Sequence, residues 1–322
     1  MRIIELNDQT KNNLLDSLLK RSPNSYGSYE QTVNEIITQI REKKDEALFA
    51  YTKQFDHCEI TKDNIKVTSK EIEEAYKKVD PKLLEVMKKS AANITEFHQK
   101  QLHNSWISPK DNGTILGQRI TPIEVSGVYV PGGKAAYPSS VLMNVLPAKV
   151  AGVSRIIMTT PPGADGKVNP ATLVAADIAG VDEVYKAGGA QAIAAMAFGT
   201  ESIPRVDKIT GPGNIFVALA KKACFGYVSI DSIAGPSEIL VLADESANPR
   251  FVAADLLSQA EHDEMASAIL ITTSKTLAGQ VSEEVEQFTK ELSRKEIIEK
   301  SLENYGYILI AQNMEEAIEA AN

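Results

Sequence analysis

The feature that most constrains the fold of this chain is a regular alternation of short apolar segments with helical segments, beginning near Ile120. Short β-branched runs predict strands, and longer segments with helical spacing predict helices between them. The expected strands are 124–130, 155–160, 182–186, 206–209 and 228–230, and the expected helices are 139–151, 169–179, 191–198 and 214–224. This alternation is typical of a parallel sheet covered by helices on both faces, so the expected fold class is α/β.

A second alternating block follows the first. Its expected strands are 239–242, 268–272 and 307–311, and its expected helices are 249–262, 279–292 and 314–321. A chain of 322 residues suggests about two domains, at roughly 150 residues each. We therefore expect two Rossmann-like parallel-sheet units, the first over 121–235 and the second over 236–322, with the second incomplete at its C-terminus.

The segment before the alternation has the periodicity of helices. Apolar residues recur at helical spacing between Tyr29 and Ile40. Thr68 and Glu71 have the spacing of a capping box, and Asp80-Pro81 has the pattern of an N-cap followed by the first helical residue. We expect residues 1–120 to form an N-terminal helical region that packs on the second α/β unit.

Composition excludes several classes of protein. The chain has 34 Lys and Arg against 43 Asp and Glu, a net charge of −9, which argues against nucleic acid as a partner. The N-terminus becomes polar too early for a signal peptide, and no apolar stretch approaches the roughly 18 residues of a membrane span. Cys58 and Cys224 lack the spacing of a metal or redox motif and suit a reducing compartment as small buried side chains. We expect a soluble, cytoplasmic protein with no membrane partner.

Glycine-rich turns follow four of the expected strands. They are 130–133 (VPGG), 187–190 (AGGA), 211–214 (GPGN) and 234–237 (AGPS). Ligands of open α/β sheets bind at the carboxyl ends of strands, where glycine allows close approach and helix N-termini favour anions. Any one of these turns is more simply a tight connection, but the set of four favours a nucleotide or another anionic ligand. No GxGxxG motif follows a strand, so the standard dinucleotide fingerprint is absent.

A second group of candidate residues lies in the segment 258–263. Gln259 and His262 are three residues apart on an expected helix, a spacing that could direct both side chains at one zinc ion. From the spacing alone, a helix end with solvated polar residues is a more common explanation than a zinc site. No third ligand is evident. Ser237 lacks the Gly-x-Ser-x-Gly context of a nucleophile and is expected to form hydrogen bonds or a turn. Tyr129 ends an expected strand and could contact a ligand or simply fill the strand.

Five segments together resemble a known family. In chain order they are GVYVPGG (127–133), AGGAQ (187–191), GPGN (211–214), IAGPSE (233–238) and DLLSQAEHD (255–263). They closely resemble histidinol dehydrogenase. The resemblance implies a zinc-dependent, NAD-linked enzyme of histidine biosynthesis that oxidises L-histidinol to L-histidine through an aldehyde, reducing two NAD in turn. It also implies a homodimer that exchanges C-terminal segments.

The resemblance also implies roles for particular residues. They are Tyr129, Gln191 and Asn214 for NAD, Ser237, Gln259 and His262 for the substrate, and Gln259 and His262 for zinc. The catalytic Glu–His pair of the family and its other two zinc ligands, an aspartate and a histidine, are expected beyond Asn322. We therefore expect no catalytic acid or base in this chain, and negligible dehydrogenase activity from these 322 residues alone.

Two alternatives remain open from the sequence. One is a related zinc- and NAD-dependent dehydrogenase of another small alcohol. The other, if the chain is naturally short, is a non-catalytic protein that binds a nucleotide or a partner.

Overall fold

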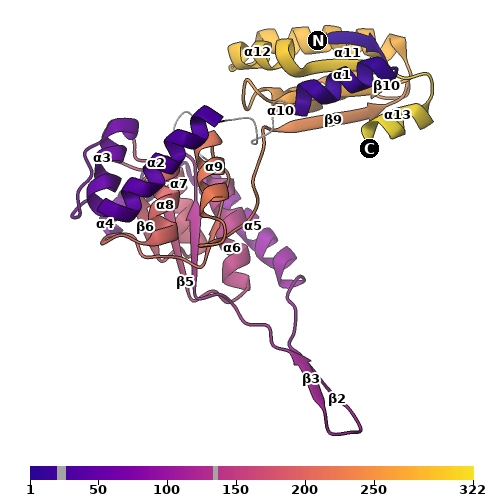
Figure 1. Cartoon of the computed structure of the whole chain (residues 1–322). Coiled ribbons are helices and arrows are strands. Elements are labelled where there is room, and N and C mark those ends of the chain that lie inside the picture. Colours follow the sequence, from indigo (N-terminus) through magenta and orange to yellow (C-terminus); the bar gives the residue numbers. More distant parts are fainter. Residues whose placement is uncertain (20–26, 133–136) are drawn as a thin grey trace. The chain divides into compact units, whose positions relative to one another are not determined.

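The chain forms two compact units, each built on a parallel sheet. The structure is a computed structural model that describes residues 1–19, 27–132 and 137–322. One unit comprises Gly27–Ala234, and the other combines Met1–Tyr26 with Gly235–Asn322. Helices cover the sheet of each unit (Figure 1). The expected α/β fold with two Rossmann-like units is confirmed.

The sheet of the 27–234 unit has five parallel strands in the order β6-β5-β4-β7-β8. Their bounds are β4 (Val125–Tyr129), β5 (Arg155–Thr160), β6 (Glu183–Lys186), β7 (Lys208–Thr210) and β8 (Ser229–Ile230). Sequence order runs outward from β4 in both directions, so β4 and β7 form the switch point at which such sheets bind ligands. Most residues of β4, β5 and β6 are buried because helices cover both faces of the sheet.

Helices cover this sheet in two groups. One core joins the sheet to α4 (Ser69–Tyr76), α5 (Pro81–Gln99), α6 (Pro138–Val150) and α7 (Pro170–Ala179). The other group is α2 (Gly27–Lys43), α3 (Asp45–Asp56), α8 (Gly189–Phe198) and α9 (Ile215–Cys224). Strand side chains alternate between the two groups. A Cβ atom on Gly127 would approach Met196 of α8, whereas Val128 packs in the core of the first group.

Two helix starts expected from the sequence are confirmed. The Thr68 hydroxyl accepts a hydrogen bond from the Glu71 N–H at 3.3 Å, and the Glu71 carboxylate accepts one from the Thr68 N–H at 2.9 Å. The Asp80 carboxylate accepts from the Lys82 N–H at 2.7 Å, and Pro81 is the first residue of α5. Local hydrogen bonding therefore sets where α4 and α5 begin.

The second unit has a four-stranded parallel sheet in the order β1-β11-β10-β9. The strands are β1 (Arg2–Glu5), β9 (Glu238–Ala243), β10 (Ser267–Thr272) and β11 (Gly306–Ile310). One face packs on α10 (Pro249–Ala260), α11 (Lys275–Glu291) and α12 (Lys295–Tyr305), and the other on α1 (Asp8–Leu19) and α13 (Met314–Ala321).

The N-terminal region differs from the expectation of a helical segment on the second unit. Its first strand, β1, pairs with β11 of the second sheet, but α2 to α5 belong to the first unit, where they pack on the helices α6 to α9. Residues 106–118 form an antiparallel hairpin of β2 (Trp106–Pro109) and β3 (Ile115–Gln118), which extends away from the rest of its unit (Figure 1). Helical periodicity marks an apolar face but does not specify the sheet that covers it.

Candidate active site

A cavity of about 770 Å³ lies at the carboxyl edge of the five-stranded sheet. The loops after β4, β5, β6 and β7 contribute to its wall, together with residues of α2 and α3. Tyr129, Gln191 and Asn214, the three residues that the family resemblance implies for NAD, all line it. The cavity therefore lies at the switch point between β4 and β7, where open α/β sheets bind ligands.

Tyr129 is the last residue of β4, and its ring is buried under the cavity wall. The phenolic oxygen accepts a hydrogen bond from the Gly189 N–H at 3.1 Å. Burial raises the pKa of Tyr129 to about 12. The phenol therefore stays neutral at physiological pH and keeps its O–H as a donor.

Gln191 is a buried polar side chain of the cavity wall that the protein leaves without hydrogen-bond partners among the described residues. It lies in the first turn of α8 and is 1% exposed. Its side-chain amide oxygen and nitrogen are both buried with no hydrogen-bond partner among the described residues. A buried polar group left without partners costs about 1–3 kcal/mol, so the position suits a ligand that supplies both a donor and an acceptor.

Asn214 both caps a helix and lines the cavity. It is the N-cap of α9, and its side-chain oxygen accepts from the N–H groups of Phe216 and Val217 at 3.1 and 3.2 Å. Because the oxygen caps the helix, the amide nitrogen is the side-chain group left to donate to a ligand.

The glycines of the turns chiefly allow one loop to pack on the next. At Gly211 the φ angle is +123°, and a Cβ atom would lie 2.0 Å from the carbonyl oxygen of Tyr129. A Cβ atom on Gly132 or Gly188 would lie 2.6 Å from the Pro161 ring. Gly133, in the first of the turns, lies outside the described residues. Glycine is therefore needed at these positions for tight connections, as the simpler expectation has it. The turns after β4, β6 and β7 also line the cavity together.

Sequence reasoning missed one charged residue of the cavity, Asp56. It is the last residue of α3, and its Oδ2 atom is buried without a partner among the described residues. Burial raises the pKa of Asp56 to about 6, against the lowering effects of His57 and of a hydrogen bond from the Gly188 N–H. An acidic side chain at a helix C-terminus opposes the helix dipole, and that local mismatch was a signal the sequence offered.

The residues implied for substrate and zinc lie in the other unit, at the amino ends of its strands. Ser237 directly precedes β9, and its carbonyl accepts from the Ser267 N–H at the start of β10 at 3.0 Å. The expected helix over 249–262 ends earlier, because α10 stops at Ala260. Gln259 is therefore in the last turn, and His262 lies in the following turn, where its N–H donates to the Gln259 carbonyl at 3.0 Å.

The donor types at this turn suit zinc, but the set is small. Gln259 is half-buried and His262 is exposed. Among the residues the structure describes, no group of three or more His, Cys, Asp or Glu side chains could hold a metal ion. Cys58 and Cys224 are both buried free thiols, as expected.

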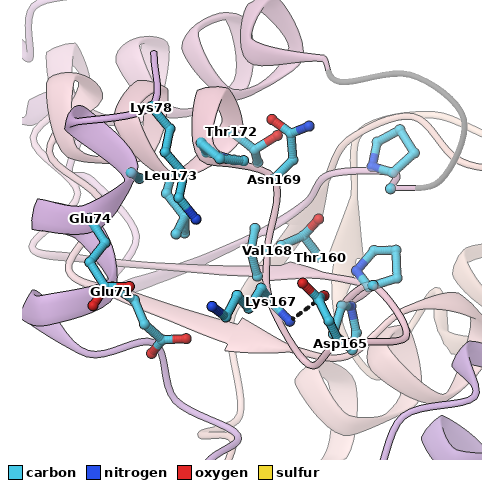
Figure 2. Close-up of a pocket in the computed structure, with 17 residues that line it drawn as sticks. Glu71, Glu74, Lys78, Thr160, Asp165, Lys167, Val168, Asn169, Thr172 and Leu173 are labelled. Atoms are coloured by element: carbon cyan, nitrogen blue, oxygen red, sulfur yellow. Dashed lines mark hydrogen bonds between the residues drawn. The ribbon is translucent and has the colours of Figure 1, made fainter.

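A smaller hollow of about 320 Å³ lies beside α4 and the N-terminus of α7 (Figure 2). It shares the prolines and glycine of the loops after β4 and β5 with the larger cavity. Its charged side chains have both signs, with Glu71 and Asp165 opposite in charge to Lys78 and Lys167. Glu71 is already paired with Lys186 at 2.6 Å, so this hollow has no field of one sign for a charged ligand.

The family model for histidinol dehydrogenase matches residues 19–322. The chain belongs to the histidinol dehydrogenase family. Histidinol dehydrogenase of Clostridium acetobutylicum is 53% identical over 322 residues, which are all of this chain and 74% of that protein. Histidinol dehydrogenase of Bacillus subtilis is 55% identical over 306 residues, 94% of this chain and 71% of that protein.

The fold is also similar to that of a solved structure from the same family. The crystal structure of histidinol dehydrogenase from Elizabethkingia anophelis has a TM-score of 0.91 and 40% identity, and the match covers all of this chain and 73% of that one. Membership of the histidinol dehydrogenase family makes the protein an oxidoreductase. None of the helices among the described residues is long and apolar enough to cross a membrane.

Proposed function

We propose that the cavity at the switch point of the five-stranded sheet binds NAD, as part of an NAD-dependent histidinol dehydrogenase. The observation that supports this most is the Gln191 side chain, buried in the cavity wall with neither amide atom partnered. A carboxamide or an adenine offers a donor beside an acceptor, the pair that Gln191 lacks. Tyr129 and Asn214 supply further polar contacts to the cofactor, as the family resemblance implies.

The proposed reaction has two oxidations. In the first, the alcohol carbon of L-histidinol gives a hydride to NAD⁺ and its hydroxyl gives a proton, which leaves an aldehyde. In the second, water adds to the aldehyde, and the hydrate gives a second hydride to NAD⁺ and a proton, which leaves the carboxyl group of L-histidine. Bound NAD⁺ would supply the hydride acceptor for both stages, and the cavity residues would bind and orient it.

Zinc is proposed as the metal that positions the substrate. An imidazole nitrogen and an amide oxygen are donors that zinc accepts, so His262 and Gln259 fit two places in its shell. Bound zinc would hold the substrate and polarise its oxygen. Catalytic zinc sites usually have three protein ligands, and no group of three or more His, Cys, Asp or Glu side chains that could hold a metal ion occurs among the described residues. Ser237 is proposed to hydrogen-bond the substrate.

A homodimer and a cytoplasmic location are also proposed. The β2–β3 hairpin exposes Trp106, Ile107 and Ile115, which are 51%, 74% and 69% exposed. A two-stranded hairpin is marginally stable by itself, and exposed apolar patches mark association surfaces. A second copy of the chain is the partner that we propose for this hairpin, and the molar mass in solution tests it.

The NAD proposal is tested by titrating the chain with NADH and following its fluorescence. The variant Gln191→Leu should bind NADH at least tenfold more weakly while its thermal stability stays equal or rises, because the unpartnered amide is removed. Gln54→Leu, at an exposed position of α3, is the control and should bind as the wild type does. Unchanged NADH binding by Gln191→Leu, or no binding by the wild type, would contradict the proposal.

A further inference from the structure

Asp56 is the one charged side chain among the described residues that line the proposed cofactor cavity. Its carboxylate lies between the end of α3 and the beginning of α8. The Gly188 N–H, at the N-cap of α8, donates a hydrogen bond to it. The second oxygen, Oδ2, is buried and has no hydrogen-bond partner among those residues.

Three features of this carboxylate are locally unfavourable. It is partly buried, it is at the wrong end of the α3 dipole, and one oxygen has no donor. Burial raises the pKa of Asp56 to about 6, so it is mostly ionised at neutral pH. Residues that break local rules in this way cluster at binding sites, where a ligand supplies what the protein lacks.

The chemistry of the missing partner follows from the group and its surroundings. An ionised carboxylate only accepts hydrogen bonds, so the ligand must present donors. A metal ion would need more ligands than this carboxylate, and no metal-binding group of three occurs among the described residues. Within a dinucleotide, the hydroxyls of a ribose are the donors that suit a lone carboxylate.

We propose that Asp56 accepts a hydrogen bond from the 2′-hydroxyl of the adenosine ribose and thereby selects NAD over NADP. The inference rests on the proposed binding of NAD in this cavity. A 2′-phosphate in place of that hydroxyl brings negative charge against Asp56. No lysine or arginine among the described lining residues compensates it. The selection therefore comes from one attraction and one repulsion at the same atom.

The test compares dissociation constants of NADH, NADPH and 2′-deoxyadenosine NADH, measured by fluorescence on the 322-residue chain. The wild type should prefer NADH to both other ligands by at least tenfold. In Asp56→Asn the preference for NADH over NADPH should fall at least tenfold, and loss of the 2′-hydroxyl should matter less. Glu46→Gln, which removes an exposed carboxylate from the same helix, is the matched control and should keep the wild-type preference.

The outcomes separate this inference from the proposed function. If the wild type binds none of the ligands, the NAD site fails and the selection fails with it. If Gln191→Leu weakens NADH while Asp56→Asn leaves the preference unchanged, the cavity stands and the role of Asp56 is overturned. The deoxy ligand needs no variant, so a wild type that binds it as tightly as NADH also overturns the role of Asp56, even if Asp56→Asn fails to fold.

Discussion

At the scale of single residues, the cavity is marked by polar groups that the fold leaves unsatisfied. Gln191 has two buried amide atoms without partners, and Asp56 has one buried oxygen without a partner, among the described residues. Native proteins satisfy most buried polar groups, so two such residues in one cavity wall indicate a ligand surface. Both groups lower stability in the unliganded protein, and binding would recover that free energy.

The Asp56 carboxyl group should make stability depend on pH in a defined direction. Its pKa in the folded chain is raised to about 6 from 3.8, so the folded state binds an extra proton between these values and loses stability as pH rises. The free energy of unfolding of Asp56→Asn should therefore be about 1–2 kcal/mol higher than that of the wild type at pH 7, allowing for the partial exposure of the group.

The measurement is urea unfolding of Asp56→Asn and wild type at several pH values. The difference in the free energy of unfolding should shrink as pH falls through 6 and vanish below about 4, where the carboxyl is protonated in both states. An Asp56→Asn chain less stable than the wild type at pH 7 would show that the carboxylate is stabilising and would contradict this assignment.

At the scale of elements, the N-termini of two helices, α8 and α9, both define where the helices begin and line the cavity. α9 begins at Asn214, whose side chain caps it, whereas the N-cap of α8 is Gly188, which has no side chain to do so. The first turn of α8 therefore keeps N–H groups for neighbours and ligands. One of these, at Gly189, already orients the Tyr129 hydroxyl.

The cap and the ligand contact of Asn214 can be separated. Asn214→Asp keeps an oxygen for the Phe216 and Val217 N–H groups but removes the amide donor, so stability should stay within about 0.5 kcal/mol of the wild type. NADH binding should weaken at least fivefold, because a carboxylate replaces a donor in the cavity wall.

Asn169→Asp is the matched control. Asn169 caps α7 through its side-chain oxygen in the same way and lines the smaller hollow (Figure 2). It should keep both stability and NADH binding. Equal NADH binding by wild type and Asn214→Asp would show that Asn214 only caps the helix.

At the scale of the whole molecule, the implied roles are divided between the two units. The residues implied for NAD all belong to Gly27–Ala234, and those implied for substrate and zinc belong to the unit that includes Gly235–Asn322. The roles implied for NAD can therefore be tested by substitutions in one unit, and those implied for substrate and zinc by substitutions in the other.

Zinc binding tests the roles implied for Gln259 and His262. After dialysis against metal-free buffer, we expect elemental analysis of the 322-residue chain to show well under one equivalent of zinc, because two ligands hold the ion weakly. Added zinc should bind more weakly to His262→Ala than to the wild type, while both bind NADH equally. Stoichiometric zinc that survives dialysis and is unaffected by His262→Ala would place the metal elsewhere.

Much of the fold could be predicted from local sequence patterns. Most of the features that the prediction missed depend on residues far apart in the chain. Strands such as β5 lie where their apolar, β-branched runs indicated, and the caps at Thr68 and Asp80 are as expected. The hairpin over 106–118 was missed, although Asn112-Gly113 at its turn is a hairpin signal. The acidic side chain of Asp56 at a helix end is a local signal, but nothing in its neighbours shows that Gly188, far along the chain, begins a helix beside it.

The sequence by itself determined the alternating strands and helices of the two blocks apart from α12, the glycine turns and the family, because each depends on nearby residues or on ordered motifs. Only the tertiary structure decided that β1 pairs with β11 and that α2 to α5 pack on the helices of the first unit. It also decided that Tyr129, Gln191 and Asn214 share a cavity with Asp56. The physical reason is that an apolar face must be buried and a strand edge must be hydrogen-bonded, but several distant segments of the chain could meet either need.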